Sequence, residues 1–189
     1  MNVTGIILSG GKSTRLGQDK GLLELNGKPM IQHVIDHIDP ICDQVLISAN
    51  EKKYENFGFP VYKDVITDIG PAGGIISCLG HSTNNKNLII SCDLPYASTN
   101  FIRKLLDLSS DYEITLPKYG PHLQPLCAVY SKRVYKTFKE CVTMGVYSLK
   151  SIIMEFQVQV IEQNTIPEFD YSKELNNINS KDDLENQQV

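Results

Sequence analysis

A loop rich in glycines and cations follows the first apolar segment of the chain, at residues 8–20. Its glycines and basic side chains are Gly10, Gly11, Gly17, Lys12, Arg15 and Lys20. Glycines let backbone N–H groups approach an anion closely. Residues 10–30 also hold a net charge of +2, in a chain whose formal net charge is -4. This combination predicts a polyphosphate ligand, and a tight turn that binds nothing is the alternative.

Two common phosphate-binding patterns do not fit this loop. The Walker A pattern requires a glycine at position 6, where Ile6 stands. The G-x-G-x-x-G pattern of dinucleotide-binding folds has no match among Gly5, Gly10, Gly11 and Gly17. The loop therefore belongs to neither class of phosphate site.

Two acidic residues follow predicted strands and are candidates for the same site. Asp93 comes just after the apolar segment 87–91, where a carboxylate is costly unless it is paired or bound to a metal. We interpret it as a Mg²⁺ ligand, with a helix cap or a lone salt bridge as the alternative. Asp64 follows a short segment at 61–63, and its carboxylate suits the N1–H and N2–H₂ donors of guanine, or a ribose. A solvated loop acid is the alternative there.

The segments that must position these residues alternate between strands and helices. Predicted strands are 3–8, 44–48, 61–63, 87–91, 114–117, 126–130 and 157–161. Predicted helices are 30–38, 71–79, one from residue 99, 132–142, 148–154 and a last one capped by Ser180. The first strands are continuously apolar, which predicts a mostly parallel, Rossmann-like sheet in a three-layer α/β/α fold. Ligands of such sheets bind beyond the carboxyl ends of the strands, where the glycine loop and Asp93 lie.

Length, composition and charge exclude several classes of protein. The chain has 189 residues without an internal repeat or long linker, so we expect one domain, 1–189. The net charge comes from residues 168–189, which argues against a basic nucleic-acid-binding face. The longest apolar run is 126–130, far short of the ~20 residues of a membrane span. Five cysteines without a C-x-x-C pair, and an N-terminus unlike a signal peptide, predict a cytoplasmic protein with reduced thiols.

The sequence resembles the family of molybdenum cofactor guanylyltransferases (molybdopterin-guanine dinucleotide biosynthesis protein A). The signature L-x-G-G-x-S-x-R-[ML]-G-x-D-K, followed by L-L-x-L-x-G-K-P, is similar to residues 8–20 and 22–29. The resemblance continues through Asp64 and the blocks 70–74, 92–95, 124–126 and 177–180, and so covers nearly the whole chain. It implies a fold of the nucleotide-diphospho-sugar transferase type.

The resemblance also implies a reaction and its residues. The family transfers GMP from GTP to the phosphate of molybdopterin, with or without molybdenum, and releases pyrophosphate; Mg²⁺ is the expected cofactor. A cytidylyl- or uridylyltransferase acting on molybdopterin or on a sugar or polyol phosphate is the alternative. The implied GTP site is Leu8, Ser9, Gly10, Lys20, Asp64 and Asp93, with Asp93 binding the metal. The implied catalytic residues are Arg15, Lys20 and Asp93, and the implied molybdopterin contacts are Gly73, Gly74, Asn177 and Asn179. We expect GTP binding within about 1–110 and molybdopterin binding within about 111–189.

The chain departs from the family pattern at two places. Ser48 stands where some relatives carry asparagine, and the stretch after Gly145 lacks an arginine, for which Lys150 is the candidate substitute. A nucleotide-binding protein without catalytic activity remains a rival of another class, although the chain retains the three implied catalytic residues. We expect transient contacts with cofactor-synthesis or recipient molybdoenzymes, no nucleic-acid or membrane partner, and a monomer.

Overall fold

The computed structural model describes residues 2–10, 19–109, 111–178 and 183, and its centre is an eight-stranded sheet. The strand order is β10-β7-β9-β6-β1-β4-β5, with β8 paired to β7. The strands are β1 Val3–Leu8, β4 Gln44–Ser48, β5 Val61–Tyr62, β6 Lys86–Ser91, β7 Ile114–Tyr119, β8 His122–Leu123, β9 Cys127–Ser131 and β10 Val158–Glu162. β1 lies in the middle and pairs in parallel with both β4 and β6.

The sheet is mostly parallel, as predicted. β4 pairs in parallel with β5, and β7 pairs in parallel with β10. β9 runs antiparallel to its neighbours β6 and β7, and the short β8 runs antiparallel to β7. The carboxyl ends of β1, β4, β5 and β6 therefore meet at one edge of the sheet, and the loops after these strands are neighbours.

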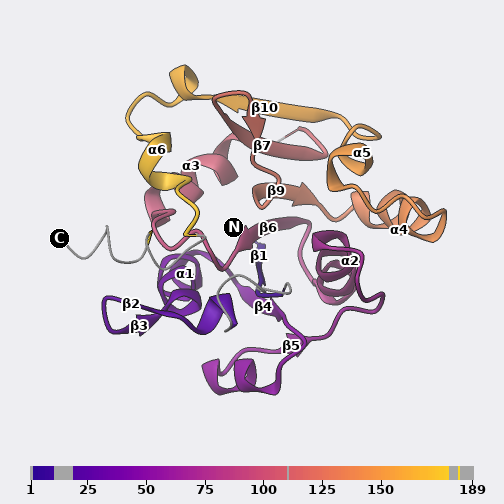
Figure 1. The fold of residues 1–189 in the computed structure, drawn as a ribbon. Coiled ribbons are helices and arrows are strands. Elements are labelled where there is room, and N and C mark those ends of the chain that lie inside the picture. Colours follow the sequence, from indigo (N-terminus) through magenta and orange to yellow (C-terminus); the bar gives the residue numbers. More distant parts are fainter. Residues whose placement is uncertain (1, 11–18, 110, 179–182, 184–189) are drawn as a thin grey trace.

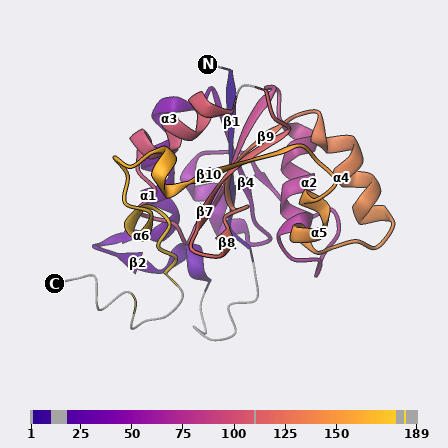
Figure 2. The same cartoon turned by 90° about the horizontal axis from the view of Figure 1, so that it is seen from above.

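Helices cover both faces of the sheet and make three layers (Figures 1 and 2). One face carries α1 Met30–Ile38, α3 Thr99–Leu108 and α6 Tyr171–Glu174, and the other carries α2 Pro71–His81, α4 Val134–Thr143 and α5 Leu149–Ile153. Successive residues of β1 point to opposite faces, so Ile7 packs with α1 while Ile6 and Leu8 pack with α2. Both faces of β1 are buried, and this explains why its sequence is mostly apolar, with Thr4 as the one polar residue.

Most predicted elements are confirmed with shifts of one or two residues at their ends. The helix 30–38 has the predicted bounds because its apolar residues recur on one face and are all buried. Ser98 caps α3, its side chain accepting a hydrogen bond from the amide of Phe101. Short 3₁₀ helices at Lys20–Leu22, Asp39–Ile41, Lys52–Phe57 and Gln163–Thr165, and also α6, are additional. The predicted helix after Ser180 lies outside the described residues.

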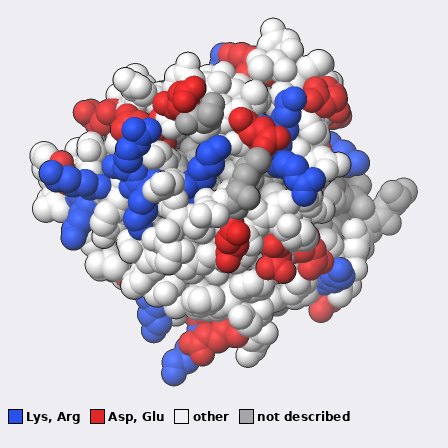
Figure 3. Space-filling model, turned by 180° about the vertical axis from the view of Figure 1, so that it is seen from behind, with Lys and Arg blue, Asp and Glu red and all other residues white. Residues whose placement is uncertain are grey.

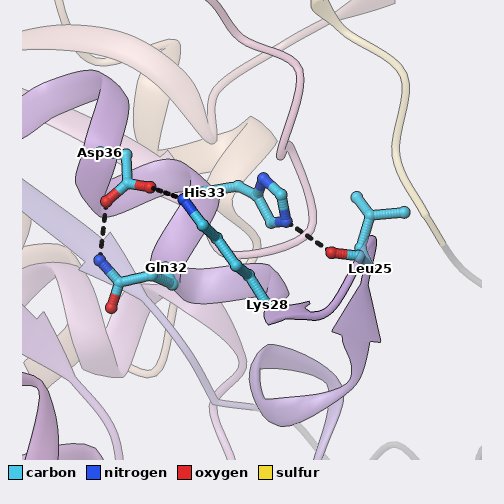
Figure 4. Close-up of polar contacts among 5 residues, drawn as sticks. All are labelled: Leu25, Lys28, Gln32, His33 and Asp36. Atoms are coloured by element: carbon cyan, nitrogen blue, oxygen red, sulfur yellow. Dashed lines mark hydrogen bonds and ion pairs between the residues drawn. The ribbon is translucent and has the colours of Figure 1, made fainter.

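A small hairpin, β2 Glu24–Leu25 and β3 Lys28–Pro29, follows the glycine loop and was not predicted. Its turn is Asn26-Gly27, with φ of 51° and 75°, a sequence that favours such turns. Two contacts attach the hairpin to α1 (Figure 4): Lys28 Nζ lies 2.9 Å from Asp36 Oδ2, and His33 Nε2 lies 2.8 Å from the carbonyl oxygen of Leu25. These two contacts fix the hairpin, which connects the glycine loop to α1, against that helix.

Two features of the described residues agree with the composition. None of their helices is long and apolar enough to cross a membrane. On the face shown in Figure 3, basic and acidic side chains are interspersed. This pattern contrasts with the broad basic face on which a nucleic-acid-binding protein relies.

Candidate active site

An ion pair joins the loop after β1 to the loop after β6. Lys20 Nζ lies 2.7 Å from Asp93 Oδ2, and the two side chains are only 19% and 17% exposed. The residues are 73 positions apart in the sequence, and the parallel pairing of β1 and β6 brings their loops together. Because solvent and salt screen a mostly buried pair weakly, the attraction between these two charges is stronger than in an exposed pair.

The second oxygen of Asp93 fits a metal ligand. Oδ1 is buried and accepts no hydrogen bond within the part of the chain that the structure describes. A buried carboxylate oxygen without a partner is costly, and a divalent cation would satisfy it. The described residues hold no group of three or more acidic, histidine or cysteine side chains suited to a metal. A single carboxylate fits Mg²⁺, which keeps several waters and binds substrate phosphates.

The end of β1 is hydrogen-bonded to the segment that carries Asp93 and to the end of β4. The amide of Ser9 donates to the carbonyl oxygen of Ser48, and the amide of Cys92 donates to that of Leu8, at 2.8 and 3.0 Å. Ser9 is buried and Gly10 is exposed. The strand ladder therefore extends one residue beyond β1, to Ser9.

Asp64 anchors a second polar group at the same edge of the sheet. It follows β5, and Ser48 Oγ donates to its Oδ1 at 3.1 Å. Its amide donates to Asn50 Oδ1 at 3.3 Å. Burial raises the pKa of the Asp64 carboxyl, and the hydrogen bonds with Ser48 and Asn50 oppose that rise. Ser48, the position where some relatives carry asparagine, ends β4 at the same sheet edge, and its role as a support of Asp64 was not predicted, nor was that of Asn50.

Gly73 and Gly74 lie in the first turns of α2 and pack against this second group. A β-carbon on residue 73 would lie 2.6 Å from the carbonyl oxygen of Ile66 and 3.4 Å from Asp64 Cγ. A β-carbon on residue 74 would lie 2.4 Å from Ser48 Oγ. Any side chain would therefore displace the polar group, so close packing beside Asp64 requires both glycines.

The remaining predicted site residues are placed only in part. Asn177 is exposed, and the amide of its neighbour Ile178 donates to the carbonyl oxygen of Asp93 at 3.0 Å, which brings this segment to the ion pair. Arg15 and Asn179 lie outside the described residues. Lys150, the candidate substitute for the family arginine, is an exposed residue of α5.

The structure also shows the state of the five cysteines and the surroundings of His33. All five cysteines are free thiols, as predicted. His33 is half-buried, and its Nε2 lies 2.8 Å from the carbonyl oxygen of Leu25 (Figure 4).

The chain is similar in sequence to known proteins. A family model described as a MobA-like NTP transferase domain matches residues 5–160. A probable molybdenum cofactor guanylyltransferase of Clostridium perfringens is 32% identical over 183 residues, which cover 95% of this chain and 92% of that protein. A molybdenum cofactor guanylyltransferase of Vibrio parahaemolyticus is 39% identical over 134 residues, 68% of each chain.

Solved structures share the fold. Molybdopterin-guanine dinucleotide biosynthesis protein A of Archaeoglobus fulgidus superposes with a TM-score of 0.82 at 20% identity, covering 97% of this chain and 95% of that chain. A CMP:2-keto-3-deoxy-manno-octonic acid synthetase complexed with CTP has a TM-score of 0.68 at 13% identity, covering 86% of this chain and 90% of that one. The fold is therefore of the nucleotide-diphospho-sugar transferase type.

Proposed function

The chain belongs to the family of MobA-like NTP transferase domains, and on this premise we propose that it is a molybdenum cofactor guanylyltransferase. It transfers GMP from GTP to the phosphate of molybdopterin, forming the guanine dinucleotide cofactor and releasing pyrophosphate. The observation that carries the proposal is the Lys20–Asp93 ion pair between the segments that follow β1 and β6, with one Asp93 oxygen that has no hydrogen-bond partner among the described residues. A cation beside a carboxylate that could hold Mg²⁺ supports the binding of a polyphosphate substrate.

The chemistry of this transfer depends on positioning and charge. The attacking oxygen belongs to a phosphate that is already anionic at neutral pH, so little general-base catalysis is needed. Two anionic groups must instead be held at one α-phosphorus, and cations supply most of the stabilisation. Lys20 would contact the triphosphate from its fixed position beside Asp93. Arg15, with a planar guanidinium suited to phosphate oxygens, is proposed for the leaving pyrophosphate or the incoming phosphate.

Asp93 is the residue proposed to hold Mg²⁺. Its buried Oδ1 needs a partner, and its Oδ2 stays bonded to Lys20. When bound, Mg²⁺ would neutralise part of the phosphate charge. Asp93 would thus orient both the metal and the Lys20 ammonium toward the triphosphate.

Asp64 is proposed to recognise the guanine base. An ionised carboxylate has about four lone-pair sites, and Ser48 occupies one of those on Oδ1. The others can accept the paired N1–H and N2–H₂ donors of guanine. Ser48 and Asn50 hold the side chain and backbone of Asp64 from the end of β4, so the acceptor is preorganised.

The second substrate is proposed to lie on the side of the C-terminal segment. The hydrogen bond from the Ile178 amide to the Asp93 carbonyl oxygen brings Asn177 near the proposed metal ligand, and amide side chains offer both donors and acceptors to a pterin. Asn179, outside the described residues, stays a proposed contact. Gly73 and Gly74 remain proposed molybdopterin contacts, although they pack on the side of Asp64. We propose that the protein acts as a monomer in the cytoplasm, where its five free thiols stay reduced.

One assay tests the activity. Purified protein is incubated with Mg²⁺, molybdopterin and each of the four NTPs, and pyrophosphate release is measured. Release with GTP alone is the expected result. Preference for CTP would instead favour the cytidylyltransferase alternative, with which the fold of the CTP-bound synthetase is compatible. Absence of release with every NTP would contradict an enzymatic function.

A further inference from the structure

A buried tyrosine hydroxyl is bonded to the residue that precedes Lys20. Tyr54 lies in the 3₁₀ helix Lys52–Phe57, between β4 and β5, and its side chain is fully buried. Its hydroxyl donates to Asp19 Oδ1 at 2.5 Å, across 35 positions of sequence. A segment outside the glycine loop is therefore attached directly to the end of that loop.

Asp19 transmits this attachment to the backbone around Lys20. It is the N-cap of the 3₁₀ helix Lys20–Leu22, and its Oδ1 also accepts from the amide of Gly21 at 3.3 Å. One carboxylate oxygen thus joins the Tyr54 hydroxyl to the first turn of that helix. Lys20 is the first residue of that helix, and its Nζ lies 2.7 Å from Asp93 Oδ2.

Gly21 shows how closely this turn is packed. A β-carbon on residue 21 would lie 2.5 Å from the Tyr54 hydroxyl oxygen and 2.3 Å from Ser9 Oγ. Distances this short leave no space for a side chain, so the turn lies directly on Tyr54 and on the end of β1. Only a glycine at position 21 allows the backbone to approach the Tyr54 hydroxyl this closely.

We propose that Tyr54 is a positioning residue for Lys20: its hydroxyl, acting through Asp19, fixes the turn from which Lys20 reaches Asp93 and the triphosphate of GTP. This inference rests on the proposed function, because it assigns a consequence for GTP binding to a residue remote in sequence. Burial raises the pKa of Tyr54, so the hydroxyl stays protonated and remains a donor.

The main rival explanation is that Tyr54 only fills the core. Phenylalanine would fill the same space, so Tyr54→Phe separates the hydroxyl from the ring. Tyr171→Phe is a matched control. Tyr171 lies on α6 and is also fully buried, and its hydroxyl donates to the carbonyl oxygen of Ile161 at 3.2 Å. Both variants lose one buried hydrogen bond, and the melting temperature of Tyr54→Phe is expected to fall somewhat more, because its acceptor is a carboxylate and not a neutral carbonyl.

Mg²⁺–GTP binding to the two variants and to the unchanged protein is measured by titration calorimetry. We expect the Kd of Tyr54→Phe to rise about tenfold, as the loss of one ordering hydrogen bond can produce, and that of Tyr171→Phe to stay within about twofold. Equal Kd values for the two variants would overturn the inference. If the unchanged protein binds no GTP, the proposed function fails and the inference fails with it.

Substitutions of Asp19 provide an independent readout. An asparagine oxygen can accept from both Tyr54 and Gly21, so Asp19→Asn is expected to retain most of the GTP affinity that Asp19→Ala loses. Combining Tyr54→Phe with Asp19→Ala is expected to weaken GTP binding little more than Asp19→Ala alone, because both changes remove the same hydrogen bond between Tyr54 and Asp19. Full additivity of the two effects, or equal losses in Asp19→Asn and Asp19→Ala, would overturn the assigned route.

Discussion

Gly74 packs so closely against Ser48 that a β-carbon on residue 74 would lie 2.4 Å from Ser48 Oγ. The same hydroxyl donates to Asp64 Oδ1 at 3.1 Å. A glycine in the first turns of α2 thus makes space for the hydroxyl that orients the proposed base-recognition carboxylate. The family block at 70–74 therefore has a structural consequence for the GTP side of the site.

Gly74→Ala is expected to weaken GTP binding about fivefold, because the Ser48 hydroxyl must rotate away and release Asp64. The loss of stability should be modest, since alanine favours a helix over glycine by about 1 kcal/mol and partly offsets the crowding. In a Ser48→Ala background the hydroxyl is absent, and Gly74→Ala should cost less affinity than in the unchanged protein. Calorimetry on the four proteins measures this coupling, and strictly additive losses would contradict it.

Some of this site was predictable because its residues lie at the ends of strands. The apolar segments 3–8 and 87–91 are recognisable by composition, so Lys20 and Asp93 could be assigned to one sheet edge before their contact was known. One oxygen of Asp93 pairs with Lys20, while the other has no partner within residues 2–10, 19–109 and 111–178. This difference depends on side-chain geometry, which a sequence pattern does not encode.

Other parts were not predictable from local sequence. The Tyr54–Asp19 and Ser48–Asp64 hydrogen bonds join segments that are separate in the sequence, and each bond depends on how these segments pack. The 3₁₀ helix Lys52–Phe57 lacks a strong apolar period. The hairpin turn at Asn26-Gly27 is different, because the dipeptide itself is a recognised turn signal and would have indicated the hairpin.

Asp93→Asn is expected to lower pyrophosphate release at least about 100-fold, because it removes the charge that pairs with Lys20 and the proposed metal ligand. Added Mg²⁺ should not restore activity. Asp36→Asn is the matched control: Asp36 also pairs with a lysine, Lys28 (Figure 4), at 2.9 Å, but both side chains of this pair are exposed. It should alter activity less than about twofold. Near-normal activity of Asp93→Asn would exclude Asp93 as the metal ligand.

The thiols should differ sharply in reactivity. Burial raises the pKa of Cys42, Cys78, Cys92 and Cys127 to about 12. Since the thiolate is the reactive form, these four should react very slowly with a thiol reagent at pH 8. The partly exposed Cys141 should be modified first, and all five should react in denaturant without reductant. Mass spectrometry identifies the labelled positions; rapid labelling of Cys92 in the native protein would contradict its burial.

Asp64→Asn is expected to reduce function without reducing stability. Burial holds the pKa of the Asp64 carboxyl above its unfolded value, so the folded state binds the proton more tightly. The stability from this group is therefore present below the unfolded pKa, about 4, and is lost as the pH rises through the raised value. The uncharged amide avoids that loss, so the variant should gain stability relative to the unchanged protein between about pH 4 and 7. Melting curves across this range measure the difference; a variant less stable at pH 7, by a gap independent of pH, would contradict the sign.

The functional effect of the same substitution should be large. Guanine presents two adjacent donors, N1–H and N2–H₂, and a carboxylate can accept from both. An amide offers one acceptor and sets its own NH₂ against the second guanine donor, so one hydrogen bond to a charged group is lost and an unfavourable contact is added. Such a loss corresponds to about 10- to 100-fold in affinity. We expect GTP binding to fall by this factor, while ATP, which lacks this donor pair, binds no worse than before. A parallel loss for both nucleotides would indicate that Asp64 contacts the ribose, because that part is common to the two.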